Sequence, residues 1–380
     1  MPAFTGTLNL NQVVGGVFNM IISQRVYADN VKGAYSKLME ASRVDGSLYG
    51  DQKLYYATNV LESREWGGDS ETGNLLQIKR PPKPEVQSIV MDKFRQIEVT
   101  IDNYLTKQAW MDEGAFSTFN SVILAWTTDT QFIHDATTFN TYVGTTETEI
   151  GEQQYTINIA EGDNEALVIA EALATLLVNL QDVSTLYNDY GFVRSYDEAD
   201  LGVVWNAKIY TKIKKIDMPT IFHTEDLLNE FKQYVLPERY WGTPVTSDNV
   251  ASFSSLISVT GTVYTVKVNQ EAYKVRSLIE RTYTFGGKEK HIFPGDSIDV
   301  GITFSAGEAY VQNDDIAFKV MHNSSIPYMS AFSVATSFFN PRSLNENHYL
   351  TWGRNTLEYL KNYPLITAKR AAAAAGAAEA

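Results

Sequence analysis

The chain of 380 residues contains no cysteine, which excludes structural disulfides, thiolate metal ligands and thiol nucleophiles. It also has no run of about 18 apolar residues long enough to cross a membrane. The longest candidate, residues 13–22, is short and is interrupted by Gly15-Gly16. The first residues lack the basic and then apolar pattern of a secretory signal. We therefore expect a protein of cytoplasmic origin without a membrane anchor.

Motifs that carry catalysis are missing as well. There is no nucleophile-elbow pattern, no Walker-type phosphate loop and no dinucleotide fingerprint between a strand and a helix. No two of the five histidines lie at a spacing that would let them bind one metal ion. His134 and Asp135 are adjacent in sequence, so on a helix their side chains would point in different directions, and we expect them at a surface or a helix end. Asp197, Glu198 and Asp200 could bind a hard metal ion, but an exposed acidic turn is favoured. We predict no enzymatic activity and no cofactor.

The composition is that of an ordinary folded protein. Hydrophobic residues make up 44% of the chain and charged residues 20%, and the length suits about two or three domains. The net charge of -14 is spread along the chain. This charge argues against tight, non-specific binding to DNA or to an anionic membrane. It is compatible with a protein that encloses nucleic acid without binding it tightly.

The most informative stretch is a long polar excursion between two predicted strands. Residues 54–60 are aromatic and β-branched, and the chain then turns polar before it stiffens at Arg80-Pro81-Pro82-Lys83-Pro84. It returns through Ile97, Val99 and Ile101 with polar residues between them, the period of a half-buried strand. An excursion so poor in apolar residues cannot bury a core of its own. It requires a neighbour, which indicates assembly rather than catalysis.

The remaining pattern predicts an α+β fold. An aromatic stripe at steps of three and four predicts one long helix over about 116–139, and further helices are expected at 28–40, 165–180 and 224–235. Strands are expected at 201–210, at 298–304 and through most of 253–340, and residues 144–163 are expected to form a loop or hairpin. The one local basic cluster is interpreted as a solvated strand face that could also touch a phosphate backbone or an acidic neighbour: Lys208, Lys212, Lys214 and Lys215.

The order of these elements resembles the major capsid protein of tailed bacteriophages, the Hong Kong 97-like fold. Residues 94–105, followed by 111–113 and the long helix, resemble the return strand of that family's E-loop entering its spine helix. Residues 201–210 resemble a central strand of the axial domain. The phrases at 326–332, 338–341 and 349–353 resemble closing strands of podophage-type capsid proteins.

The resemblance implies a division of the chain and a function. It implies an N-terminal arm and helix (1–50), an E-loop (51–103), a peripheral domain (104–160 and 326–356) and an axial domain (161–325 and 357–380) with a strand-rich region at 253–320. Such a protein would self-assemble as hexamers and pentamers into an icosahedral head around double-stranded DNA, without sequence-specific binding. A scaffolding protein would be separate or absent, portal and head-decoration proteins are further possible partners, and the virion would be assembled in the cytoplasm of a host bacterium.

The resemblance also implies which residues touch another subunit. The E-loop would lie across its neighbour, and the expected contact residues are Trp66, Lys79, Arg80, Pro81, Pro82, Lys83 and Phe94. Some relatives crosslink through an E-loop lysine, but nothing around Lys79 or Lys83 supplies the environment this needs. Two alternatives stay open: another virion component, such as a tail tube or head-tail junction protein, and a carbohydrate-active enzyme built on Asp197, Glu198 and Asp200.

Overall fold

The computed structural model describes residues 36–44, 52–63, 65, 78, 80–102, 113–148, 153–160, 162–214, 231–268 and 270–371. The chain divides into two compact units. Unit 1 comprises residues 1–51, 90–139 and 328–356, and unit 2 comprises residues 52–89, 140–327 and 357–380. The sequence predicted the α+β class, and the described elements mix helices with strands.

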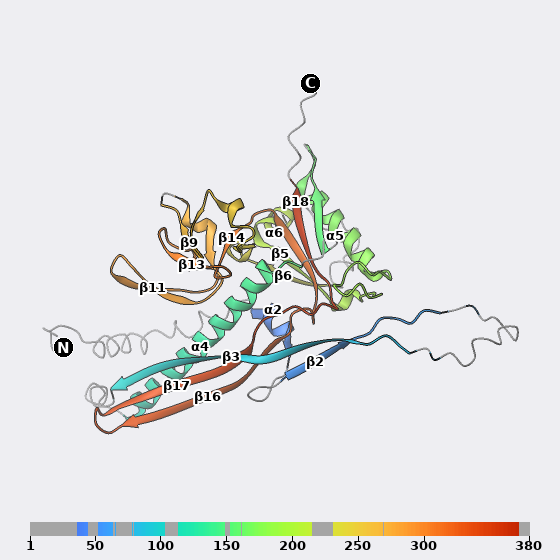
Figure 1. Cartoon of the computed structure of the whole chain (residues 1–380). Coiled ribbons are helices and arrows are strands. Elements are labelled where there is room, and N and C mark those ends of the chain that lie inside the picture. Colours follow the sequence, from blue (N-terminus) through green and yellow to red (C-terminus); the bar gives the residue numbers. More distant parts are fainter. Residues whose placement is uncertain are drawn as a thin grey trace. The chain divides into compact units, whose positions relative to one another are not determined.

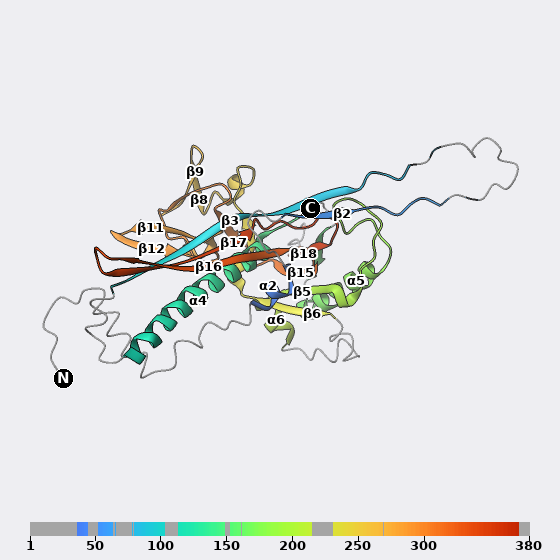
Figure 2. The ribbon, with the colours of Figure 1, turned by 90° about the horizontal axis from the view of Figure 1, so that it is seen from below.

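Unit 1 is built on long antiparallel strands and one long helix. Strand β16 (Tyr328–Asn340) pairs with β17 (Asn345–Asn355), which pairs with β3 (Glu85–Asp102), and the short β1 (Arg43–Val44) adds parallel to β16. Helix α4 (Glu113–Thr145) runs beside β16 and β17, as the two views in Figures 1 and 2 show. A second helix, α2 (Ser36–Ala41), contributes the buried side chains of Leu38 and Met39.

Helix α4 confirms the long helix predicted from the aromatic stripe and extends it to 33 residues, or about 50 Å. The predicted face of β3 is also confirmed. Ile101 is buried and Ile97 and Val99 are half-buried, whereas Glu98 and Thr100 between them are exposed. This alternation follows from the two-residue period of a strand that covers a core with one face.

Unit 2 contains a five-stranded sheet in the order β4-β18-β15-β5-β6. Its strands are β4 (Gln154–Asn158), β18 (Leu365–Ala371), β15 (Ile316–His322), β5 (Leu201–Asn206) and β6 (Lys232–Leu236). Helices α5 (Glu165–Gln181) and α6 (Ala207–Lys214) pack their apolar residues against alternate residues of β5, β15 and β18. Helix α5 follows the prediction for 165–180, and Asn164 caps its first turn by accepting from the backbone N–H of Ala166.

A strand-rich segment with a separate apolar cluster lies between β6 and β15. Its members are β7 (Gly242–Pro244), β8 (Ile257–Thr260), β9 (Val263–Val266), β10 (Val275–Ser277), β11 (Arg281–Phe285), β12 (Lys288–Ile292), β13 (Thr303–Ser305) and β14 (Ala309–Gln312). Short 3-10 turns join them at Glu238–Tyr240, Val250–Phe253 and Ala272–Lys274. Gly286 and Gly287, both at positive φ, form the hairpin turn between β11 and β12.

Three predictions of secondary structure were wrong. The strand predicted over 201–210 ends at Asn206, whose side-chain oxygen accepts from the N–H of Lys208 and starts helix α6. The helix predicted over 224–235 cannot include its last residues, since they form β6 in parallel register with β5. Residues 221–230 lie outside the described part of the chain.

The third error concerns residues 298–304. Only β13 forms there, because the chain turns at Gly301, which has φ +88°. The alternation of apolar residues is nevertheless real, since Ile298, Ile302 and Phe304 all enter the same buried cluster. Two further expectations were partly right: α2 overlaps the helix predicted at 28–40, and residues 144–163 contain β4. Residues 28–35 lie outside the described residues.

Candidate intersubunit arm

Residues 58–84, which connect β2 (Gln52–Ala57) to β3, are called the arm. From Val60 to Val86 every described residue is exposed, including Leu61 at 71% and Ile78 at 80%. Scattered exposed apolar side chains are normal on a soluble protein, but none of the described side chains of this stretch is buried, so packing does not hold these residues in place. Its conformation has to come from local stiffness, from its base and from whatever it touches.

Stiffness is supplied by Pro81 and Pro82. Proline fixes φ near −65° and restricts the residue before it to extended conformations, so Arg80-Pro81-Pro82 is held extended without backbone hydrogen bonds. Arg80 and Lys83 flank the step, and both are exposed with no acidic partner among the described residues. The step therefore presents two cations on a stiff, extended backbone.

The structure places the predicted contact residues in different settings. Arg80, Pro81, Pro82 and Lys83 lie together on the arm, whereas Trp66 and Lys79 lie outside the described residues. Phe94 belongs to unit 1, where it pairs with Gly353 of β17 and remains 39% exposed. A Cβ on Gly353 would come within 2.9 Å of the Phe94 ring, so the ring packs directly over the glycine backbone.

Sequence reasoning missed the residues that hold the base of the arm. Asn59 and Thr58 bond to Val193 and Arg194, and Gln87 bonds to the backbone of residues 359–361. The partners lie more than 130 residues apart in sequence, and glutamine and asparagine carry no periodic signal. Nothing local could have revealed them.

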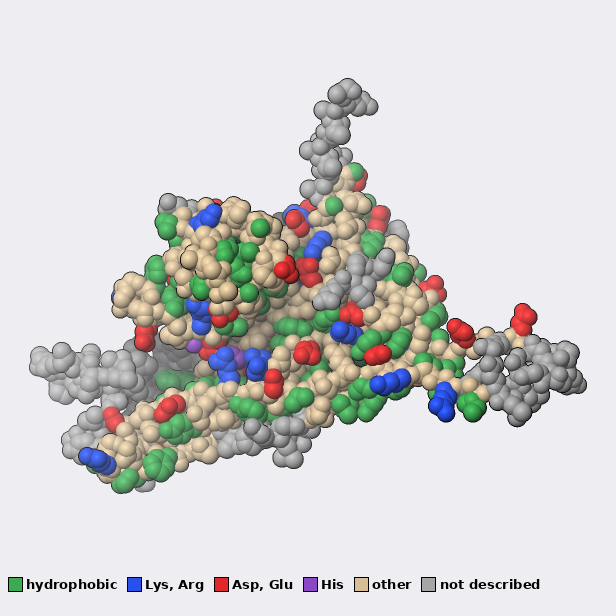
Figure 3. All heavy atoms as spheres, in the orientation of Figure 1, with side chains coloured by type: hydrophobic (Ala, Val, Ile, Leu, Met, Phe, Trp, Pro, Cys, Tyr) green, Lys and Arg blue, Asp and Glu red, His purple; other side chains and the backbone are tan. Residues whose placement is uncertain are grey.

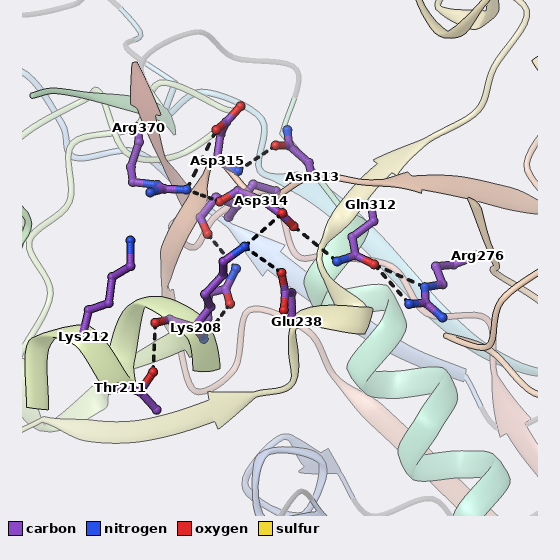
Figure 4. Close-up of polar contacts among 12 residues, drawn as sticks. Lys208, Thr211, Lys212, Glu238, Arg276, Gln312, Asn313, Asp314, Asp315 and Arg370 are labelled. Atoms are coloured by element: carbon purple, nitrogen blue, oxygen red, sulfur yellow. Dashed lines mark hydrogen bonds and ion pairs between the residues drawn. The ribbon is translucent and has the colours of Figure 1, made fainter. Parts of the chain in front are cut away.

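The described part of the basic cluster lies on helix α6 (Ala207–Lys214), not on the strand face predicted. Lys208 Nζ lies 3.0 Å from Glu238 Oε1 and 3.1 Å from Asp314 Oδ2, as Figure 4 shows. Lys212 pairs with Glu165 at 2.8 Å. Burial works against ionisation of Asp314, but the hydrogen bonds from Lys208 and Gln312 and the positive charges of Lys208 and Lys274 together outweigh it and hold the pKa of that carboxyl below its usual value.

These lysines are therefore neutralised within unit 2. Arg370 of β18 also bonds to Glu165. Gln312 links Asp314 to Arg276 of β10, as Figure 4 shows. On the face drawn in Figure 3, acidic and basic side chains are interspersed without a large field of one sign. The described residues of this cluster, Lys208 and Lys212, thus offer no concentrated positive surface for a phosphate backbone; Lys215 lies outside the described part.

The other candidates for chemistry have structural explanations. Glu198–Asp200 form a short 3-10 turn before β5, with Asp197 accepting from the N–H of Ala199, which is the acidic turn favoured above. Within the described residues, no three histidine or carboxylate side chains are grouped as a metal site. Among the described helices, none is both long and apolar enough to span a bilayer.

His134 and Asp135 contradict the prediction of a surface or helix-end position. Both are buried in the middle of α4, with His134 Nδ1 3.3 Å from Asp135 Oδ1. The same carboxylate oxygen accepts a hydrogen bond of 3.2 Å from Trp352 Nε1 of β17. The pair is thus a buried polar link between helix and sheet in unit 1, because a carboxylate at this depth needs donors to offset its desolvation.

Comparison with known proteins agrees with this architecture. The family model of Phi29-like phage major capsid proteins matches residues 5–355. In solved structures, the chain is similar to one in the capsid of Staphylococcus phage Andhra, with 10% identity, a TM-score of 0.58 and coverage of 89% of this chain and 84% of that one. It is also similar to one in the structure of the head fiber and inner core protein gp22 of native bacteriophage P68, with 11% identity, a TM-score of 0.55 and coverage of 86% and 83%.

At such low identity the two likenesses concern the fold alone, and they are consistent with the Hong Kong 97-like architecture expected from the sequence. No curated protein sequence matched the chain. The family match covers nearly the whole chain and does not support the tail-tube, head-tail junction or carbohydrate-enzyme alternatives. The chain belongs to the Phi29-like phage major capsid protein family and is a structural component of the virion, the major capsid protein that forms the phage head.

Proposed function

We propose that the arm of each subunit lies across a neighbouring subunit and that this contact closes subunits into hexamers and pentamers. The single observation that carries the proposal is that every described residue from Val60 to Val86 is exposed. A shell protein self-associates, and contacts that join different surfaces of successive copies generate closed rings. An arm without a core of its own is suited to such a contact.

The chemistry of the arm indicates what it would bind. Leu61 and Ile78 offer apolar area, while Arg80 and Lys83 offer charge on the Pro-stiffened step. Because the proline step is already extended, it loses less conformational entropy on docking than a flexible segment would. A complementary surface would combine an apolar groove with carboxylates, and an acidic subunit of net charge -14 has many of these.

The proposal extends to the other partners. The same acidic balance lets the shell enclose double-stranded DNA without gripping it, since non-specific affinity for DNA depends on neutralising phosphates with lysine and arginine. Assembly would take place in the cytoplasm of the host bacterium, with scaffolding, portal and decoration proteins as separate chains. No catalytic step is assigned to the subunit.

Deleting residues 62–84 tests the proposal. We expect a soluble subunit with unchanged thermal unfolding, because the described residues of this segment bury nothing, and loss of closed particles by electron microscopy. The finer variant Leu61→Ser with Ile78→Ser should weaken assembly in the same direction. Its matched control is Val268→Ser, which removes a similarly exposed apolar side chain (73%) from the strand-rich segment.

Two results would contradict the proposal. A deletion variant that still forms particles of normal size shows that the arm makes no essential contact between subunits. A deletion variant that unfolds shows that the arm stabilises its own subunit.

A further inference from the structure

The outgoing side of the arm is fixed where it leaves β2. Asn59 Oδ1 accepts a hydrogen bond of 3.0 Å from the backbone N–H of Val193, and the carbonyl of Thr58 accepts one of 2.6 Å from Arg194 Nη2. The Arg194 guanidinium is itself oriented, since its Nε donates to Asn362 Oδ1 at 3.1 Å. Two successive arm residues are therefore bonded to unit 2, and the next residue, Val60, is exposed.

The returning side is fixed by Gln87 of β3. Its Nε2 donates to the carbonyl of Tyr359 at 2.8 Å, and its Oε1 accepts from the N–H of Lys361 at 3.1 Å. One side-chain amide thus satisfies a carbonyl and an N–H two residues apart on an irregular segment. An amide side chain carries a donor and an acceptor side by side, which suits this arrangement.

The two anchoring segments are tied to each other by Asp189. Its carboxylate accepts from Tyr359 Oη at 2.6 Å and from Gln153 Nε2 at 2.7 Å, and its backbone N–H donates to the carbonyl of Lys361 at 2.8 Å. The outgoing and returning sides of the arm are consequently held by one connected hydrogen-bonded frame. All of these residues belong to unit 2.

We propose that Asn59, Gln87 and Arg194 form a clamp that sets the direction in which the arm leaves the subunit, and that this direction is required for docking on the next copy. The inference rests on the proposed function of the arm. Gln87 and Arg194 are positioning residues, because they lie at the base and act through the arm rather than touching the neighbour.

A small change of direction at the base of the arm becomes a large displacement farther along it. Seven residues separate Gln87 from Arg80, and all of them are described, so an extended chain between them spans roughly 23 Å. An error of about 10° at Gln87 would then displace Arg80 by roughly 4 Å, close to the spacing of about 5 Å between neighbouring strands. With no buried side chain among its described residues, the arm cannot correct such an error by packing on its own subunit.

The test uses the absence of cysteine, which allows two nitroxide labels at Leu61→Cys and Asn179→Cys, both exposed positions of unit 2. Distances between the labels are measured by pulsed electron resonance on the full-length subunit, and particles are counted by electron microscopy in unlabelled variants. We expect the double variant Gln87→Ala with Arg194→Ala to broaden the distance distribution at least twofold and to lower particle yield at least tenfold. Thermal unfolding should change little.

The matched control is Gln96→Ala, on the same strand. Gln96 makes one exposed hydrogen bond, of 2.9 Å to Thr351 Oγ1, away from the arm, so this variant should leave both readouts unchanged. The conservative changes Gln87→Glu, which keeps the acceptor and loses the donor, and Arg194→Lys, which keeps the charge, should give intermediate widths and yields. They also carry the test if the double alanine variant fails to fold.

An unchanged distance distribution in the clamp variants overturns the clamp. A broadened distribution with normal particle yield overturns its role in docking. If the variant lacking residues 62–84 assembles normally, the proposed function of the arm fails instead, while the distance distribution still decides whether the clamp orients the arm.

Discussion

Replacing Lys319 by methionine should change how the stability of the subunit depends on pH. Lys319 lies in β15 and is fully buried. Its Nζ donates to the carbonyl of Val143 at 2.7 Å and to that of Thr146 at 2.6 Å, at the C-terminal end of α4. The last four carbonyls of a helix have no partner within it, so this side chain caps α4 from the sheet. The Trp241 ring lies 5.8 Å away, at cation–π distance.

The burial of Lys319 determines how strongly the stability of the subunit depends on pH. It lowers the pKa of Lys319 from 10.5 to about 7, with Glu147 favouring the charged form and Lys369 opposing it. Those two groups lie nearby but pair with each other at 2.8 Å. Between pH 7 and pH 10.5 the unfolded chain keeps its proton while the folded chain releases it, so the folded state gains stability as the pH rises. One pKa unit corresponds to about 1.4 kcal/mol, which gives roughly 2–3 kcal/mol between pH 7 and pH 9.

Methionine has a similar length but neither titrates nor donates. Lys319→Met leaves the carbonyls of Val143 in α4 and of Thr146 just after it without their donor, at a cost of about 1–3 kcal/mol each, and removes the pH-dependent contribution. We expect the variant to be less stable than the parent at pH 9, and the difference in free energy of unfolding to shrink by roughly 2–3 kcal/mol at pH 7. Urea unfolding of the isolated subunit at several pH values measures it.

Lys208→Met provides the control, because that lysine is largely exposed and its hydrogen bonds to Glu238 and Asp314 raise its pKa. It should show no such pH dependence between pH 7 and pH 9. A stability difference for Lys319→Met that stays constant over this range would refute the reasoning about burial. A variant more stable than the parent at every pH would refute the role of Lys319 as a helix cap.

Two further predictions concern close packing and a buried carboxylate. Gly144→Ala, in the last turn of α4, should lower the free energy of unfolding in urea by about 2 kcal/mol or more, because the new Cβ would lie 2.1 Å from the carbonyl oxygen of Tyr240. On an open helix the same change usually stabilises by about 1 kcal/mol. A gain in stability would contradict the close approach of those backbones. Asp135→Ala should cost about 2–4 kcal/mol, since the indole N–H of Trp352 loses its acceptor inside unit 1, and tryptophan fluorescence during unfolding measures this. A change below 0.5 kcal/mol, roughly the size of a surface substitution, would contradict the buried link.

Periodic patterns in the sequence predicted the parts of the fold that rest on one buried face. Helix α4 and helix α5 appear close to their predicted bounds, and β3 shows the predicted alternation. The patterns failed where tertiary pairing or one side chain decided the outcome. Asn206 ends β5 by capping α6, and β6 forms because it adds to β5 rather than continuing a helix.

The candidate site could be predicted only in part. The arm was visible as a polar stretch with a proline step, because its lack of apolar residues is a property of the sequence itself. Its clamp was not, since Gln87 and its backbone partner at Tyr359 are 272 residues apart. Buried charges were missed for the same reason. The alternation around Lys319 marks an apolar strand, and only the fold brings the carbonyls of α4 to its amine.

The placement of these features separates the requirements of folding from those of assembly. Lys319 and Asp135 lie in buried surroundings, so substitutions there act on the stability of the subunit. The described residues from Val60 to Val86 are all exposed on their own subunit, so we expect substitutions there to leave the folding equilibrium almost unchanged and to act on contacts between copies. A shell protein benefits from this division, because each subunit must fold and remain soluble before its neighbours arrive. The two requirements meet at the proposed clamp, since its hydrogen bonds belong to the folded subunit while their expected consequence appears in the assembled shell.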